Sequence, residues 1–202
     1  MNDPATPATD TASGENPRSL RTQLKNAWMV EFSNFRWKLL LLPLLARLLP
    51  DSRATRLRTI LVRAIGLSID SGTRFLGMPK LQSSHAGSLK ERLRIGSDCT
   101  IGARVILEFG ELLTIGQRVS LADGVVILTT THQLGPKEHR AGALVRSPVV
   151  IGNDVVIGTD SIILPGATLG DAARVMPNSV VTANVAAGVT VSGIPARPLR
   201  AI

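Results

Sequence analysis

A step of six residues recurs through the second half of the chain and constrains its fold more than any other feature. The aliphatic residues at this step fall into three runs, separated by a slip of two residues and by a longer break: Ile95, Ile101, Leu107; Ile115, Leu121, Ile127; Ile151, Ile157, Ile163, Leu169, Val175, Val181. A helix repeats near 3.6 residues and a half-buried strand near 2, so neither explains a period of six. This period is typical of a parallel β-helix built from hexapeptides.

The geometry of such a fold assigns a role to each position of the repeat. Each hexapeptide supplies a short strand and a turn, three of them make one triangular coil, and stacked coils bury a continuous apolar column that no single coil could form. The small or β-branched residue four positions after most anchors, such as Cys99, fits a crowded corner. Asn153, Asp154 and Asp171 can adopt positive φ at the turns at low cost. A sandwich of short strands would instead alternate with period two, so the sequence predicts an all-β core.

The repeat also divides the chain. Between Ile127 and Ile151, Gln133 and His139 stand where anchors should be, so we expect the chain to leave the column there. The first residues are rich in Thr, Ala and Pro and predict a disordered tail. The predicted segments are a tail at 1–17, a basic amphipathic helical extension at 18–66, irregular early coils at 67–94, the β-helix domain at 95–187 with a loop at 133–148, and a C-terminal segment at 188–202.

Charge is concentrated in the predicted helical extension. The chain of 202 residues has a net charge of +8. The segment from Arg18 to Arg63 contains ten basic residues and only two acidic ones. The extension either caps the β-helix or associates peripherally with an anionic membrane surface. Nucleic acid is not an expected partner, because aromatic residues are only 3% and no nucleic-acid motif is present. No secretory signal is visible and Leu39–Leu49 is too short to span a bilayer, so we expect a cytoplasmic protein, at most peripheral at the cytoplasmic membrane face.

One histidine stands out by its position. His132 ends a coil and opens the predicted loop, and long excursions from regular scaffolds often carry function. We assign no role to His85. The single cysteine, Cys99, occupies an inward repeat position and is interpreted as a packed thiol rather than a nucleophile.

The stretch Ile115–Ile202 resembles the hexapeptide-repeat O-acetyltransferases, which include maltose, galactoside and exopolysaccharide acetyltransferases. The resemblance lies in five short motifs: Ile115-Gly116-Gln117-Arg118-Val119, Thr131-His132-Gln133-Leu134, Val149 to Gly158, Leu164 to Asp171, and Gly193-Ile194-Pro195-Ala196-Arg197. It implies a left-handed parallel β-helix, a hand opposite to that of most parallel crossovers.

The resemblance also implies a mechanism and a set of site residues. His132 would be the general base in direct transfer from acetyl-CoA, with no metal, and the family assembles as homotrimers with sites shared between subunits. The positions that match coenzyme contacts are Gly158, Thr159, Pro177, Thr182, Arg197 and Arg200. The chain departs from the family at Met176-Pro177-Asn178, where Gly-Ala-Gly is common, and at Ala183, where Lys is common.

The acceptor implied is a sugar hydroxyl, with lipopolysaccharide, capsule or exopolysaccharide synthesis as the context. Glu108 and Glu111 interrupt the repeat and are candidate acceptor ligands, although a surface turn explains them equally well. Three alternatives stay open: an N-acetyltransferase for an amino sugar, a non-catalytic β-helix scaffold, and a γ-class carbonic anhydrase. The last needs three converging His ligands for each zinc, and the chain has three His in all.

Overall fold

The computed structural model describes residues 55–64, 66–83 and 89–199, which belong to one compact unit, Trp37–Ile202. The predicted tail at 1–17 and the part of the helical extension before residue 55 lie outside these residues. His85 and Arg200 lie outside them as well.

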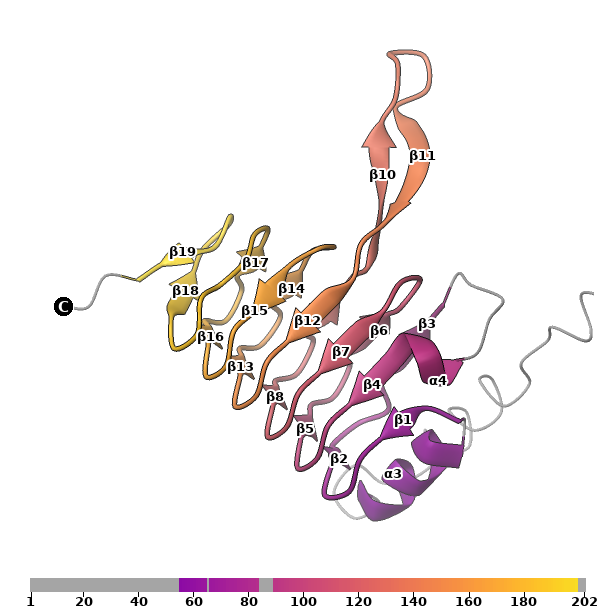
Figure 1. Cartoon of the computed structure of the whole chain (residues 1–202), viewed down its shortest axis with the longest axis vertical. Coiled ribbons are helices and arrows are strands. Elements are labelled where there is room, and N and C mark those ends of the chain that lie inside the picture. Colours follow the sequence, from indigo (N-terminus) through magenta and orange to yellow (C-terminus); the bar gives the residue numbers. More distant parts are fainter. Residues whose placement is uncertain (1–54, 65, 84–88, 200–202) are drawn as a thin grey trace, which may run out of the picture. The chain divides into compact units, whose positions relative to one another are not determined.

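The described chain winds through three sheets, named A, B and C here, whose stacked strands are parallel (Figure 1). Sheet A contains β1 (Ser68–Ile69), β4 (Leu93–Ile95), β7 (Leu113–Ile115), β12 (Val149–Ile151) and β15 (Thr168–Leu169). Sheet B contains β2 (Arg74–Phe75), β5 (Thr100–Ile101), β8 (Ser120–Leu121), β13 (Val156–Ile157), β16 (Arg174–Val175), β18 (Thr190–Ser192) and, antiparallel at its edge, β19 (Arg197–Pro198). Sheet C contains β3 (Lys80–Gln82), β6 (Ile106–Glu108), β9 (Val126–Ile127), β14 (Ile162–Ile163) and β17 (Val180–Val181). Each coil passes from A to B to C, which confirms the predicted parallel β-helix, and the three parallel sheets are consistent with the left hand that the resemblance implies.

The register of sheet A shows where the regular coil is interrupted. Ile151 pairs with Leu169, 18 residues later, as three hexapeptides require. The corresponding separation is 26 residues from Ile69 to Ile95, 20 from Ile95 to Ile115, and 36 from Ile115 to Ile151. In each of these three coils, the residues beyond the regular 18 form an insertion that follows a strand of sheet C and precedes the next strand of sheet A. The three insertions therefore occur at the same corner of successive coils.

The core is the column that the repeat predicts. The anchors from Ile95 to Val181 are at most 2% exposed. The small corner residues are buried too, including Cys99, Ser161 and Ala173 at 0%. Burying one large aliphatic side chain stabilises a fold by about 1.5–3 kcal/mol, so the stacked anchors are the main source of stability.

The turn residues singled out in the sequence are used in two ways. Asp154 has a φ of 58°, whereas Asn153 and Asp171 are not among the residues with positive φ. Their side chains instead join coils: Asn153 Oδ1 accepts from Gln117 N at 2.9 Å, and Asp171 Oδ1 accepts from Asn153 N at 2.7 Å. The glycine after the anchor lets the backbones of neighbouring coils approach closely, because a Cβ on Gly116 would lie 2.8 Å from the backbone of Gly152.

Two predicted boundaries were wrong. The stretch from Ser68 to Gln82 is not irregular, because β1, β2 and β3 form a regular first coil that pairs with β4, β5 and β6. Irregular structure follows only after Gln82 and includes the short helix α4 (Leu89–Arg92). The column also continues past residue 187, since β18 pairs in parallel with β16.

Helix α3 (Thr55–Ala64) lies beside the first coil and contacts β2. It buries Val62 and Thr59 against that coil. Among the described residues, no helix has the length and hydropathy needed to cross a membrane.

Candidate functional site

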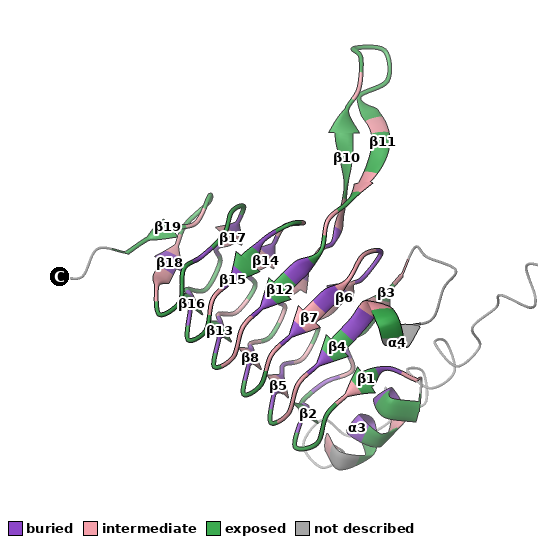
Figure 2. Cartoon of the chain, in the orientation of Figure 1, coloured by how far each residue is buried: buried purple, intermediate pink, exposed green. Residues whose placement is uncertain are grey.

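The predicted loop is a two-stranded antiparallel hairpin, called the arm here (residues 130–146). It consists of β10 (Thr130–Leu134) and β11 (Ala141–Arg146) and projects away from the stacked coils (Figure 1). Most of its residues are exposed (Figure 2), including Leu134, at 82%. The arm therefore presents side chains outside the column while its root stays attached to the coil.

His132 lies on β10 opposite Leu144, immediately before an irregularity in the ladder. Its Nδ1 is 2.8 Å from the carbonyl oxygen of Gly142. Because a carbonyl oxygen can only accept a hydrogen bond, Nδ1 must carry the proton. In the neutral ring, Nε2 then keeps an unshared electron pair, and the side chain is exposed. This arrangement fixes both the tautomer and the orientation that a general base needs.

Glu108 anchors the root of the arm. Its Oε2 accepts hydrogen bonds from Thr129 N at 2.6 Å and from Thr129 Oγ1 at 2.8 Å, and its Oε1 accepts from Gly110 N at 2.8 Å. Thr129 is completely buried, and its carbonyl accepts from Ser147 N at 2.9 Å, which closes the other side of the root. Both carboxylate oxygens of Glu108 are thus engaged within the chain.

Glu111 is engaged as well. Its Oε1 accepts from Arg92 Nη1 at 2.9 Å and from Leu112 N at 3.1 Å, and its own N–H donates to Thr129 Oγ1 at 3.1 Å. Arg92, Glu108, Glu111 and Thr129 form a connected set, which we call the root network. The interactions join the two earlier insertions to the arm. The sequence had singled out the two glutamates but gave no signal for Arg92 or Thr129.

The predicted coenzyme residues fall on two corners of the prism. Gly158 and Thr159 follow β13 and stack against the next coil at Pro177 and Asn178, since Asn178 N donates to Thr159 O at 2.9 Å. A Cβ on Gly158 would lie 2.5 Å from Pro177 N, so only glycine allows this spacing. Arg197 is exposed on β19, opposite Ser192, one coil further along the same corner.

Thr182 lies apart from that group. It follows β17 at the corner between sheets C and A, the same corner from which the arm leaves two coils earlier. Sheet C therefore separates the two sets of predicted residues, and its outward side chains Val126, Ile162 and Val180 are only partly buried. The structure brings Gly158, Thr159 and Pro177 together but does not bring Thr182 to them.

The cysteine is unsuited to nucleophilic chemistry. Cys99 is 0% exposed, and burial is the main factor that raises the pKa of its thiol above the ordinary value. Its Sγ lies 3.1 Å from the carbonyl oxygen of Gly116, to which it donates. A neutral, buried thiol is a poor nucleophile, in agreement with the interpretation of Cys99 as a packing residue.

A second electrostatic feature lies on the surface between coils. Arg118 Nε donates to Asp154 Oδ1 at 2.6 Å and Nη2 to Oδ2 at 2.7 Å. The hydrogen bonds from Arg118 lower the pKa of Asp154 below its ordinary value of 3.8. This exposed pair joins two coils at the corner between sheets A and B, whereas the arm leaves from the corner between sheets C and A.

Comparison with known proteins gives matches over the column. Residues 148–183 match the family described as bacterial transferase hexapeptide (six repeats), and residues 92–129 match the hexapeptide repeat of succinyl-transferase. The chain is 32% identical over 113 residues to galactoside O-acetyltransferase of Escherichia coli (strain K12), which covers 53% of this chain and 56% of that protein. It is 40% identical over 108 residues to nodulation protein L of Rhizobium meliloti (strain 1021), covering 50% and 59%. The chain thus spans little more than half the length of these curated relatives.

The likeness extends to a solved structure. A hexapeptide-repeat-containing acetyltransferase of Vibrio cholerae, in complex with acetyl coenzyme A, superposes with a TM-score of 0.65 at 28% identity. The superposition covers 84% of this chain and 88% of that one.

Proposed function

Because the chain belongs to the hexapeptide-repeat acetyltransferase family, we propose that it transfers an acetyl group from acetyl-CoA to a sugar hydroxyl. The observation that carries this proposal is the hydrogen bond between His132 Nδ1 and the carbonyl oxygen of Gly142. It leaves Nε2 as a free acceptor on an exposed side chain, at the one extended arm of the described column.

His132 acts as general base in the proposed reaction. Acetyl-CoA supplies the acetyl group as an activated thioester. Nε2 of His132 takes the proton from the sugar hydroxyl while that oxygen forms a bond to the acetyl carbon. The carbon–sulfur bond breaks, and His132 returns the proton to the departing coenzyme thiolate. The Gly142 carbonyl oxygen stabilises the ring while it is positively charged, because the Nδ1 proton stays hydrogen-bonded throughout.

The coenzyme is proposed to lie along the corner formed by Gly158, Thr159 and Pro177. The absence of a side chain at Gly158 brings the coils close there, and the exposed guanidinium of Arg197 lies one coil further on, where it can bind a phosphate. Thr182 is proposed to contribute from outside this cluster, and Arg200 is proposed as a further coenzyme contact. Ala183 cannot replace the lysine that is common in the family, so we expect Arg197 to carry more of the phosphate binding.

A complete site requires a second subunit in this proposal. His132 stands on an arm that projects from its own column, whereas the proposed coenzyme corner lies across sheet C. A homotrimer would place the arm of one subunit against the column of the next. In this proposal Glu108 and Glu111 do not bind the sugar directly but hold the arm in place through the root network. The sugar would be bound by side chains of the neighbouring subunit that face the arm.

The biological context proposed is acetylation of an envelope polysaccharide at the cytoplasmic face of the membrane, with the basic segment at 18–66 providing peripheral association. Acetyl-CoA turnover should therefore be measured with free thiol release, using neutral sugars, amino sugars and envelope glycans as acceptors. Faster turnover with hydroxyl acceptors than with amino sugars is expected; a preference for the amine would point to N-acetylation.

His132→Ala tests the mechanism directly. Loss of a general base typically lowers kcat by about 10²–10⁴-fold. His139→Ala is the matched control, because His139 is also exposed and lies in the turn of the same arm. Full activity of the His132 variant would exclude this mechanism, and coenzyme binding without transfer to any acceptor would identify a non-catalytic scaffold.

A further inference from the structure

The arm has two faces, and only one of them carries His132. Thr130 lies opposite Arg146 in the ladder and His132 lies opposite Leu144, with no irregularity between these two pairs. Directly opposite residues, and alternate residues of one strand, share a face of a hairpin, so these four side chains lie on one face, called the histidine face here. Arg146 is therefore on the same side of the arm as the proposed base.

The reverse face of the arm is uncharged. It carries Thr131 and Val145, which lie opposite each other, and Ala143, the alternate residue on β11. The remaining charged residues of the arm lie beyond this regular part of the ladder, toward the tip: Lys137, Glu138 and Arg140. The positive charge of the regular ladder is thus confined to the histidine face.

The guanidinium of Arg146 is available to a ligand. Arg146 is exposed, and no residue in the described ranges forms an ion pair or a hydrogen bond with its side chain. Its backbone is nevertheless held in place, because the next residue, Ser147, donates its N–H to Thr129 O at 2.9 Å at the root of the arm. A guanidinium carries five N–H donors in a fixed planar fork. Arg146 therefore presents these donors from the rooted end of the arm.

Arg146 and His132 are diagonal neighbours across the hairpin. Such residues lie about 7–8 Å apart, which is within reach of a long side chain. The imidazole is turned toward the tip, because its Nδ1 binds the carbonyl oxygen of Gly142, which is nearer the tip than Leu144. The root side of the ring is therefore left to Arg146. A sugar placed there can present one hydroxyl to Nε2 and another substituent to the guanidinium.

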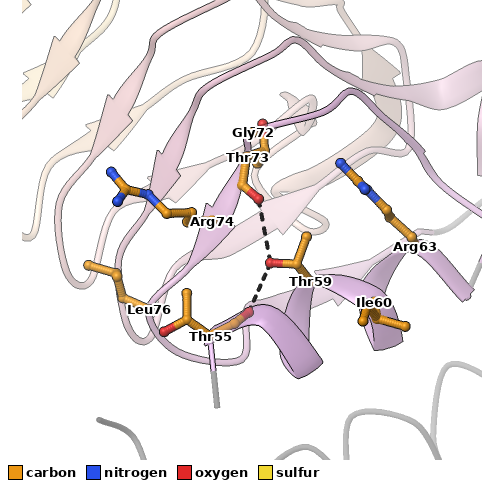
Figure 3. Close-up of a pocket in the computed structure, with 8 residues that line it drawn as sticks. All are labelled: Thr55, Thr59, Ile60, Arg63, Gly72, Thr73, Arg74 and Leu76. Atoms are coloured by element: carbon orange, nitrogen blue, oxygen red, sulfur yellow. Dashed lines mark hydrogen bonds between the residues drawn. The ribbon is translucent and has the colours of Figure 1, made fainter. Parts of the chain in front are cut away.

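Three arginines elsewhere in the described structure show a different arrangement. Arg118 forms an ion pair with Asp154. At the pocket between α3 and the first coil, Arg63 donates to the carbonyl oxygen of Asp70, and Arg74 is directed away from Arg63 (Figure 3). These three cations are paired or point apart, and none of them shares a face with the proposed base.

We propose that Arg146 selects an acceptor sugar that carries a carboxylate, the chemical class of the uronic acids. This inference rests on the proposed acetyl transfer and names its acceptor. The guanidinium binds the carboxylate through parallel N–H···O bonds, while Nε2 of His132 takes the proton from a hydroxyl of the same sugar. A carboxylate is favoured over a phosphate, because one guanidinium balances its single charge, whereas a phosphate monoester carries close to two charges at neutral pH. Arg146 acts in addition to the side chains of the neighbouring subunit that face the arm.

The test compares two acceptors that differ in one charge. Methyl β-D-glucuronamide has the same hydroxyl groups as methyl β-D-glucuronide, but an uncharged amide replaces the carboxylate. With the full chain, kcat/KM for each is measured by release of free thiol from acetyl-CoA. Wild type should prefer the glucuronide about tenfold, the lower end of the effect of a hydrogen bond to a charged group, because the site is exposed. A higher kcat/KM for methyl β-D-glucoside 6-phosphate than for the glucuronide would overturn the choice of a carboxylate.

Three variants test whether Arg146 is responsible. Arg146→Gln should abolish the preference for the glucuronide while kcat/KM for the amide and KM for acetyl-CoA stay at wild-type values, which also shows that the variant is folded. Arg146→Glu should reverse the preference, because its carboxylate repels that of the sugar. Arg140→Gln is the matched control: Arg140 is exposed in the same arm but lies outside the regular ladder, and this variant should keep the wild-type preference.

The outcomes separate this inference from the proposed function. Equal kcat/KM for the two acceptors in wild type, or an undiminished preference in Arg146→Gln, would overturn the role of Arg146 and leave acetyl transfer in place. A loss in Arg146→Gln that is equal for both acceptors would show a structural role instead, and a raised KM for acetyl-CoA alone would assign the guanidinium to the coenzyme. Failure of the wild type to acetylate any sugar, charged or uncharged, would contradict the proposed function itself.

Discussion

Replacing Glu108 by Gln tests whether this residue holds the arm or binds the acceptor. Glutamine keeps the size of the side chain but supplies one acceptor oxygen and one amide group that donates. If its oxygen accepts from Thr129 N and Oγ1, its amide group faces the N–H of Gly110, and two donors then meet. The reverse orientation loses the bond from Thr129 N, although the hydroxyl of Thr129 can then accept from the amide group. Glutamine therefore loses at least one hydrogen bond in either orientation.

The magnitude follows from the kind of bond lost. A hydrogen bond to a charged group contributes about 1.5–3 kcal/mol to stability. For a chain of this size, 1 kcal/mol corresponds to about 2–4 °C in Tm, so Glu108→Gln should lower Tm by roughly 3–12 °C. The arm that carries His132 would be held less firmly, and kcat should fall by roughly ten- to a hundredfold.

The assay is thermal unfolding together with steady-state kinetics in which acceptor and acetyl-CoA are varied separately. Glu138→Gln is the matched control, because Glu138 is exposed in the turn of the arm, and it should leave both Tm and kcat unchanged. An unchanged Tm in Glu108→Gln, with a raised KM for the acceptor alone, would refute the structural role and support direct acceptor binding.

Three further substitutions test the coil geometry by thermal unfolding. Ala172→Gly should raise stability by roughly 0.5–1 kcal/mol, because Ala172 has a φ of 57° and glycine relieves the strain at a smaller entropic cost; a lower Tm would contradict this. Asp154→Asn should lower Tm at neutral pH, and the deficit should vanish as the pH falls through the folded pKa of Asp154, which Arg118 holds below 3.8; a deficit that persists in acid would contradict the pairing. Gly158→Ala should lower Tm and weaken coenzyme binding, since its Cβ would lie 2.5 Å from Pro177 N; wild-type values of both would show that the coils separate freely.

The periodic part of the fold was predictable because each anchor obeys the same local rule. Even the first coil carried the signal, since Ile69, Phe75 and Leu81 follow the step of six and pair with the next coil. Two features concealed it: Phe75 is aromatic, and an insertion after Gln82 shifts the phase of the repeat. A search that admitted aromatic anchors and tested each phase separately would have found it.

The contacts that hold the site were not predictable in the same way. Glu108 and Thr129 are 21 residues apart, and they meet only because one coil returns the chain to the same corner after a two-residue slip. Asn153 and Asp171 show the same limit on a smaller scale. Both are typical turn residues, yet here their side chains accept backbone hydrogen bonds from the neighbouring coil, which depends on the stacking and not on local propensity.

The position of the three insertions explains how the arm is supported. Because all three leave the column between sheets C and A, on consecutive coils, they lie next to one another. Arg92, at the end of the first insertion, binds Glu111 and the carbonyl oxygen of Gly110 in the second. Glu111 and Glu108 in turn bind Thr129 at the root of the third. Each insertion therefore supports the next, and the orientation of His132 depends on residues up to forty positions earlier in the chain that need not contact either substrate.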